Sequence, residues 1–205
     1  MSRGSCVWMC VGLVLVTLAS SGCGGSASYE KTRFLLDPAR ENGPAGGEPD
    51  AVLEVRRFTI DAAFSSKGLV YRTGESQYES DFHNEFLVTP VAMIREATRD
   101  WLAQSNLFER VAEPGSYVEP TFALEANVTA LYGDLRDESA RQAVVEMRVF
   151  FLKVRGSRDP MLLYKKTYRA TNAIDESSPS SLVAALDRCL QTILVELEAD
   201  IAAKL

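Results

Sequence analysis

The sequence has few of the residues that most catalytic and metal sites use. It contains one histidine, His83, and a single cysteine, Cys189, after residue 23. A zinc site takes several His, Cys or carboxylate ligands, and nucleophilic hydrolysis needs a Ser or Cys beside a base. The sequence also has no Gly-x-Ser-x-Gly turn and no glycine-rich phosphate-binding loop. We therefore expect no catalytic residues, no metal and no cofactor, and interpret the protein as a non-enzymatic binding or assembly part.

Positive charge is also scarce. The sequence has 22 basic and 28 acidic side chains, which give a formal net charge of −6 at pH 7. No segment is strongly basic, whereas nucleic-acid-binding proteins carry basic patches that contact phosphates. We therefore expect no nucleic-acid partner.

Long hydrophobic runs are absent except at the start of the chain. Residues 6–18 are almost free of polar atoms and follow a single positive charge, Arg3. This run is about 13 residues long, whereas a helix that spans a bilayer needs roughly 20. Small residues follow at 19–22, and this order of charged, apolar and small-residue regions is typical of a secretory signal peptide. We predict a signal peptide over residues 1–22 rather than a permanent transmembrane helix.

Cys23 indicates which kind of signal peptide this is. The sequence Ala19-Ser-Ser-Gly-Cys23 resembles the lipobox of bacterial lipoproteins, although Ser20 stands where that motif usually has Leu. The resemblance implies a diacylglyceryl thioether on Cys23, cleavage before it, and acylation of the new N-terminus with a fatty acid such as palmitate. The alternative is an ordinary secreted protein with an incidental cysteine. Gly24 replaces the Asp that retains enteric lipoproteins in the inner membrane, which favours the outer membrane.

Cleavage would leave residues 23–31 as a lipidated N-terminus and tether, followed by one domain at residues 32–205. The loss of Arg3 changes the net charge from −6 to about −7, and the loss of Cys6 and Cys10 leaves Cys189 without a thiol partner. The domain then has no internal disulfide, so its stability must come from packing. Cys189 falls within an apolar helical stripe, and we predict that it is a core residue rather than a reactive thiol.

Hydrophobic periodicity predicts the elements of this domain. Residues 121–132, 141–155 and 161–173 alternate as long antiparallel strands do when one face of the sheet is covered. In the last two we expect the inward side chains to be Val145, Met147, Val149 and Phe151, and Leu162, Tyr164, Tyr168 and Ala170. Residues 90–106 and the stretch from residue 178 onward have apolar side chains at helical spacing, opened by Thr89-Pro90 and Ser178-Pro179. The first helix has Trp101 in its apolar stripe and is expected to end at Asn106 in a left-handed turn. The apolar stripe of the second is Leu182, Leu186, Cys189, Leu190, Ile193, Leu197 and Ile201. Shorter strands are expected at residues 33–37, 51–61, 69–73 and 107–111. We predict an α+β fold, a single two-layer domain in which a mainly antiparallel sheet packs against two main helices.

Three stretches are less regular. Residues 51–61 change the phase of their alternation near Arg56-Arg57, which indicates a bulge. Residues 77–89 place Tyr78, Phe82 and Phe86 at helical spacing, yet the stretch is equally compatible with a strand that extends a hairpin. Residues 39–50 hold three glycines and two prolines and are expected to form a loop.

A series of short motifs runs through the mature chain. After the lipidated cysteine they are Phe34-Leu-Leu-Asp-Pro38, Leu53-Glu-Val-Arg-Arg-Phe58, Gly68-Leu-Val-Tyr-Arg72, the aromatic stretch Tyr78…Phe82…Phe86…Pro90, and Trp101-Leu…Ser105-Asn-Leu-Phe108. In this order they resemble the ABC-type transport auxiliary lipoproteins, which include the paraquat-inducible-protein C type and the lipoproteins beside MCE-domain intermembrane lipid transporters. The family commonly has a Trp a few residues before the proline, where this sequence has Phe86.

The resemblance implies a lipid-anchored protein of the bacterial cell envelope that faces the periplasm. Its implied partner is the MCE-domain substrate-binding subunit of an ABC system that moves lipids or other apolar compounds between membranes. Lipid itself is a further candidate ligand. The alternative function is an outer-membrane scaffolding or assembly lipoprotein with no link to ABC transport.

A docking part needs exposed aromatic and Arg side chains, because these dominate binding hot spots. The densest such cluster outside the regular core pattern is Tyr71, Arg72, Tyr78, Phe82 and Phe86. We expect Arg72 and Tyr78 to contact the partner, with Phe82 and Phe86 packed beneath them. The alternative is that these rings only cap the end of the sheet.

Overall fold

The computed structural model describes residues 30–40, 48–113, 115–154 and 160–205. The chain divides into two units, Met1–Glu30 and Lys31–Leu205, and every element described below lies in the second. The predicted signal peptide, Cys23 and most of the tether lie outside the described residues, as does most of the predicted loop at 39–50. In the described part of the chain, no helix is long and apolar enough to cross a membrane.

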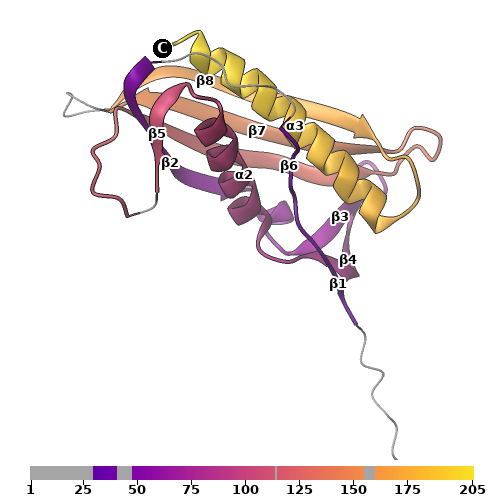
Figure 1. Cartoon of the computed structure of the whole chain (residues 1–205). Coiled ribbons are helices and arrows are strands. Elements are labelled where there is room, and N and C mark those ends of the chain that lie inside the picture. Colours follow the sequence, from indigo (N-terminus) through magenta and orange to yellow (C-terminus); the bar gives the residue numbers. More distant parts are fainter. Residues whose placement is uncertain (1–29, 41–47, 114, 155–159) are drawn as a thin grey trace, which may run out of the picture. The chain divides into compact units, whose positions relative to one another are not determined.

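The described residues of the second unit form one eight-stranded sheet and two main helices (Figure 1). In chain order the elements are β1 (Thr32–Phe34), β2 (Glu48–Ile60), the short 3-10 helix η1 (Ala62–Phe64), β3 (Gly68–Arg72), β4 (Tyr78–Phe86), α2 (Pro90–Gln104), β5 (Phe108–Ala112), β6 (Phe122–Asp134), β7 (Gln142–Lys153), β8 (Met161–Ala173) and α3 (Pro179–Ala202).

Strand β6 joins the two parts of the sheet. On one edge it pairs in parallel with β2 and, at its end, with β3, while β7 pairs antiparallel along its whole length. β8 continues the antiparallel part beside β7, whereas β4 and β1 extend the sheet beyond β3 and β5 lies beside β2. Both helices lie on one face of the sheet in Figure 1. The longest pairings are the antiparallel ones of β6, β7 and β8, which confirms the predicted α+β fold with a mainly antiparallel sheet.

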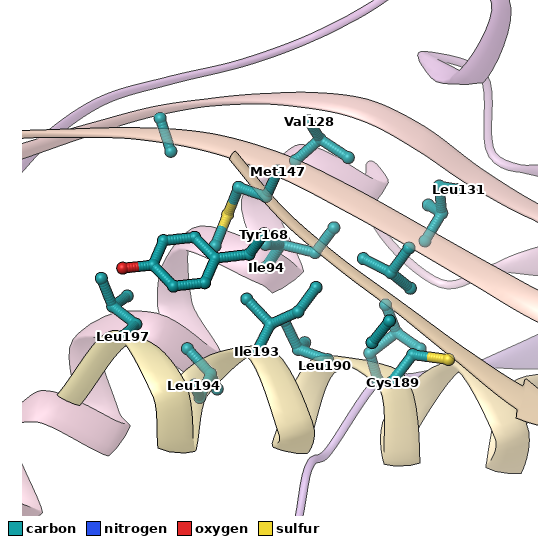
Figure 2. Close-up of a cluster of buried hydrophobic side chains, with 14 of the residues drawn as sticks. Ile94, Val128, Leu131, Met147, Tyr168, Cys189, Leu190, Ile193, Leu194 and Leu197 are labelled. Atoms are coloured by element: carbon teal, nitrogen blue, oxygen red, sulfur yellow. The ribbon is translucent and has the colours of Figure 1, made fainter. Parts of the chain in front are cut away.

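Helix α3 covers the antiparallel part of the sheet with a continuous apolar stripe (Figure 2). Ser178 caps the helix by accepting a hydrogen bond from the backbone N–H of Ser181, as its sequence predicts. Every predicted member of the stripe is buried, and it packs against the predicted inward side chains of β7. These two sets are Leu182, Leu186, Cys189, Leu190, Ile193, Leu197 and Ile201 on α3, and Val145, Met147, Val149 and Phe151 on β7.

Cys189 is a core residue, as predicted. Its side chain is buried and has no disulfide partner among the described residues. The Sγ atom lies 3.6 Å from the backbone oxygen of Ala143 and donates to it. Burial raises the pKa of the Cys189 thiol to about 11, so the thiol stays protonated and unreactive near neutral pH.

Helix α2 packs its apolar stripe against β2 and β5. Pro90 occupies the first turn and Trp101 is 3% exposed, both as predicted. Thr89 has the extended backbone of a cap residue, although its side chain makes no cap hydrogen bond. Asn106 has a φ of 54°, the left-handed conformation that we expected to end the helix.

The irregular stretches take definite forms. Residues 78–86 form strand β4 and not a helix, because they pair with β3 and β1. The predicted bulge at Arg56-Arg57 is confirmed by a register shift between Val55 and Phe58. Residues 39–50 do not all form a loop, since β2 already begins at Glu48.

Leu162 corrects one prediction about the core. We expected it to face inward with the alternating residues of β8, but it is exposed. A register shift between Phe151 and Leu152 of β7 offsets the first residues of β8. Tyr168 and Ala170, beyond the shift, are buried as predicted.

Candidate functional site

Four side chains, which we call the Tyr78 cluster, gather where β3 and β4 meet the end of β6. The ring of Tyr78 contacts those of Tyr132 and Phe64 edge-on, with 5.5 and 6.2 Å between centroids. The guanidinium of Arg72 lies 5.7 Å from the Tyr78 centroid, which is a cation–π distance. Tyr78 is 44% exposed. The cluster therefore caps this end of the sheet and still presents one tyrosine to solvent.

Charged groups surround the Tyr78 cluster. Arg72 donates to the backbone oxygens of Gly74 and Glu75, at 3.2 and 2.6 Å. Arg136 pairs with the carboxylate of Asp134 at 2.8 Å and lies 3.6 Å from that of Glu75. The hydrogen bonds from Arg136 lower the pKa of Asp134 below its ordinary value. This rim of fixed opposite charges suits recognition by a polar protein surface.

Tyr71 precedes Arg72 in β3, but its side chain contacts a turn within β4 rather than the Tyr78 cluster. Its hydroxyl donates to Oδ2 of Asp81 at 3.3 Å, and burial together with the nearby carboxylate raises the pKa of Tyr71 to about 12. The other carboxylate oxygen accepts the backbone N–H groups of His83 and Asn84, at 2.8 and 2.9 Å. Burial opposes ionisation of Asp81, but these hydrogen bonds outweigh it and lower the pKa of Asp81. Tyr71 thus has a positioning role and is only partly exposed.

Phe82 and Phe86 lie in opposite environments. Phe86 is 2% exposed and belongs to the core, as expected of a residue packed beneath the surface. Phe82, which we expected beside it, is 66% exposed. The turn at Asp81 explains the difference, because β4 shifts register against β3 there and regular alternation is lost. The expectation that Phe82 packs beneath Arg72 and Tyr78 was wrong.

The five candidate partner-binding residues therefore do not form one surface. Arg72 and Tyr78 come together at the end of the sheet, whereas Phe82 projects beside β1. Tyr71 and Phe86 support these positions from within.

A second feature, a groove of about 730 Å³, lies between residues 35–40 and helix α2. Its volume falls within the range of small-molecule sites. Both apolar and charged side chains line the groove; they include Leu35, Leu36, Val88, Met93 and Trp101, with Arg95, Glu96 and Asp100.

Contacts of Arg40 and Asp37 fix residues 35–40, which run between α2 and α3 in Figure 1. Arg40 forms a two-pronged ion pair with Glu198 of α3, at 2.5 and 2.9 Å, and its guanidinium lies 4.9 Å from the Trp101 ring centroid. Trp101 Nε1 donates to the same carboxylate at 2.7 Å. The backbone N–H of Asp37 donates to Oδ1 of Asp187, also on α3, at 2.8 Å. These contacts, which we call the α2–α3 clasp, hold one wall of the groove.

The sequence contained only a weak signal for this groove. Arg40 sits in the stretch expected to be a loop, and nothing in the spacing connects it to Glu198, 158 residues later. The one usable signal was Glu198 itself, an acidic residue beside the buried Leu197 on a largely apolar helix.

Among the residues that the structure describes, no three His, Cys, Asp or Glu side chains are grouped so that they could hold a metal ion. The candidate sites described above are the Tyr78 cluster, the exposed Phe82 and the groove beside α2, and each could bind a partner or a ligand non-covalently.

This chain was compared with protein-family models, with curated proteins and with solved structures. The model described as ABC-type transport auxiliary lipoprotein component matches residues 34–198. No functionally curated protein was found to match.

Three solved structures share the fold at low sequence identity. A Xanthomonas campestris protein of the family DUF330 has a TM-score of 0.67 and 14% identity, over 86% of this chain and 94% of its own. An uncharacterized protein has a TM-score of 0.66 and 15% identity, over 84% and 99% of the two chains. A hypothetical protein of Chlamydia trachomatis has a TM-score of 0.51 and 12% identity, over 75% and 99%.

We predict that the stability of the domain depends on pH through Asp187, which belongs to the α2–α3 clasp. Burial raises the pKa of Asp187 from 3.8 to about 6. The Asp187 carboxyl group favours the folded state when it is protonated, because its pKa is higher in the folded state. Its contribution to the free energy of unfolding is therefore fully present below pH 3.8 and is lost as the pH rises through about 6. Asp187→Asn removes the charge and keeps an oxygen for the Asp37 N–H. We expect it to raise the free energy of unfolding at pH 7 by about 1–2 kcal/mol, with no gain near pH 4.

Urea unfolding at both pH values measures this effect. Glu196→Gln, at an exposed position of the same helix, is the matched control and should change stability little at either pH. A gain that is the same at pH 4 and pH 7, or a loss at pH 7, would contradict the assigned environment of Asp187.

Proposed function

The chain belongs to the ABC-type transport auxiliary lipoprotein family, and from this we propose that it is a non-enzymatic, lipid-anchored auxiliary part of an MCE-associated ABC transport system. Such a system moves lipids or other apolar compounds between membranes. The chain would bind the MCE-domain substrate-binding subunit from the periplasmic side. The observation that carries the proposal is the family match over residues 34–198, which spans nearly all of the described domain.

The anchor in this proposal is Cys23, carrying a diacylglyceryl group and an acylated N-terminus. Ala19-Ser-Ser-Gly-Cys23 supports it, as does the apolar run of residues 6–18 before it. Stable attachment usually takes two hydrophobic signals, and a triacylated cysteine exceeds that requirement. Gly24 after the cysteine supports the outer membrane as the site of attachment.

The docking surface in this proposal is the Tyr78 cluster with its charged rim. Tyr and Arg are the side chains that most often dominate binding energy at interfaces. Tyr78 is partly exposed and is held in place by two other rings, so that binding would cost it little conformational entropy. Arg72 and Arg136 supply charge beside it, each already oriented by an acid or a backbone oxygen.

Substitution of Cys23 tests the anchor. Cys23→Ala removes the only thiol that could accept the diacylglyceryl group at the cleavage site, so we expect unprocessed precursor or soluble protein. Membrane fractionation and the mass of the N-terminal peptide measure this, with Cys10→Ala as a control that keeps Cys23 and should fractionate normally. Recovery of the Cys23→Ala protein in membranes in a shortened, processed form would contradict lipidation.

Substitution of the Tyr78 cluster tests the docking surface. Arg72→Glu combined with Tyr78→Ala removes the exposed ring and reverses one charge, so recovery of the MCE-type subunit with the tagged protein should fall at least tenfold. Tyr117→Ala, which removes a fully exposed tyrosine from the β5–β6 connection, is the matched control and should leave recovery unchanged. Circular dichroism checks folding of both variants. Undiminished recovery with the folded double variant would exclude this surface.

A further inference from the structure

Exposed apolar side chains gather around β1 and β4. Of the ten large hydrophobic side chains exposed among the described residues, five belong to β4, to the two residues after it, or to the residue after β1: Leu35, Tyr78, Phe82, Leu87 and Val88. β1 and β4 are direct neighbours in the sheet, where Phe34 pairs with Phe86. The backbone oxygen of Phe34 also accepts a hydrogen bond from the backbone N–H of Leu87 at 2.8 Å. Four of the five, all but Tyr78, thus flank one short pair of strands at the edge of the sheet.

Cations are interspersed with these apolar groups. The ammonium of Lys31 lies 5.3 Å from the centroid of the Phe82 ring. Lys31 and Arg33 share the carboxylate of Glu85, at 2.8 and 3.2 Å. Lys67 donates to the backbone oxygen of Leu87 at 2.8 Å. The acidic groups here are Glu85, Glu30, which directly precedes Lys31, and Asp81, which directly precedes Phe82, so the two signs of charge are balanced along this edge.

The same edge is the part of the domain nearest along the chain to Cys23. Eight residue steps separate Cys23 from Lys31, and a fully extended chain of that length spans at most about 29 Å. A lipid held at Cys23 therefore keeps Lys31 and its neighbours close to the bilayer surface.

We propose that this β1–β4 edge, formed by Lys31, Arg33, Leu35, Phe82 and Leu87, contacts the headgroup region of the membrane that holds the anchor. Phe and Leu are typical of the apolar faces that interfacial segments bury at the boundary between headgroups and acyl chains, and cations beside them interact with lipid phosphates. Phe82 and Leu35 reach the boundary of the acyl chains, while Lys31 and Arg33 lie at the level of the phosphates. The inference rests on the proposed function only in that it takes Cys23 as the point of attachment. Contact at this edge would fix how the domain stands on the membrane and leave the Tyr78 cluster free for a protein partner.

Tryptophan fluorescence on tethered protein tests this contact. The mature chain, residues 23–205, is coupled through Cys23 to a maleimide phospholipid in vesicles of phosphatidylethanolamine and phosphatidylglycerol with brominated acyl chains. Cys189 is buried and its thiol pKa is raised, so coupling is confined to Cys23. Phe82→Trp places a reporter at the proposed contact, and Leu162→Trp is the matched control, on an exposed strand residue of similar accessibility. Trp101 is buried and gives the same background in both.

We expect brominated lipid to quench the Phe82→Trp reporter at least twofold more than the control, with a shift of its emission to shorter wavelength. Adding Lys31→Glu and Arg33→Glu should reduce that quenching, because the phosphates then repel the edge. Equal quenching of the two reporters would overturn the proposal. So would an emission shift that depends on protein density rather than on lipid, since a second copy of the chain would then cover the edge. Because the tether is imposed chemically, neither result depends on lipidation in the cell or on the ABC partner.

Discussion

The packing of helix α3 against β6, β7 and β8 is the interaction on which the rest of the structure depends. The described residues contain one free cysteine and no disulfide, so stability comes from burial. Each fully buried Leu or Ile side chain contributes roughly 1.5–3 kcal/mol, and the stripe of α3 carries several in succession. The covered strand β6 then serves as the template on which β2 and β3 pair, and β3 in turn positions β4 and β1.

The positions of the candidate surfaces follow from this order of packing. The α2–α3 clasp joins residues 35–40 to both helices through Arg40 and Asp37. Desolvation offsets much of the attraction in a buried ion pair of this kind, whereas loss of one partner would leave an uncompensated buried charge. The clasp thereby fixes the segment that continues from β1 and one wall of the groove. In the proposed function, the lipid anchor precedes β1 along the chain and the docking surface lies at the end of β3, and β4 pairs with both of these strands.

Most of the fold could be predicted from the sequence, because its signals are local. Burial alternates along the central residues of β6 and β7, and the 3.6-residue period of α3 continues to Ile201. The stretch from Tyr78 to Phe86 could not be assigned, since its aromatic spacing fits a helix and only pairing with β3 and β1 makes it a strand. The position of Phe82 depends on the turn that Asp81 makes with His83 and Asn84, which no periodicity reveals.

The groove and the clasp could not be predicted for a different reason. Arg40 and Glu198 stand 158 residues apart, and their pairing follows from the tertiary arrangement of α2 and α3. Of the candidate site, the sequence selected the segment from Tyr71 to Phe86, in which Tyr78 and Phe82 are exposed and Phe86 is buried; that this segment docks a partner stays a prediction. The sequence did not show that Phe86 alone of these three is buried, or that Tyr78 and Phe82 are exposed at two separate places.

The central proposal is that the chain serves an MCE-associated ABC system. It is tested most directly by identifying the proteins that co-purify with the chain from native membranes. The intact lipidated chain, tagged at its C-terminus, is isolated from native membranes in mild detergent, and the proteins recovered with it are identified by mass spectrometry against an untagged control. We expect an MCE-domain subunit together with its permease and ATPase. Recovery of outer-membrane assembly proteins with none of these three would contradict the proposal.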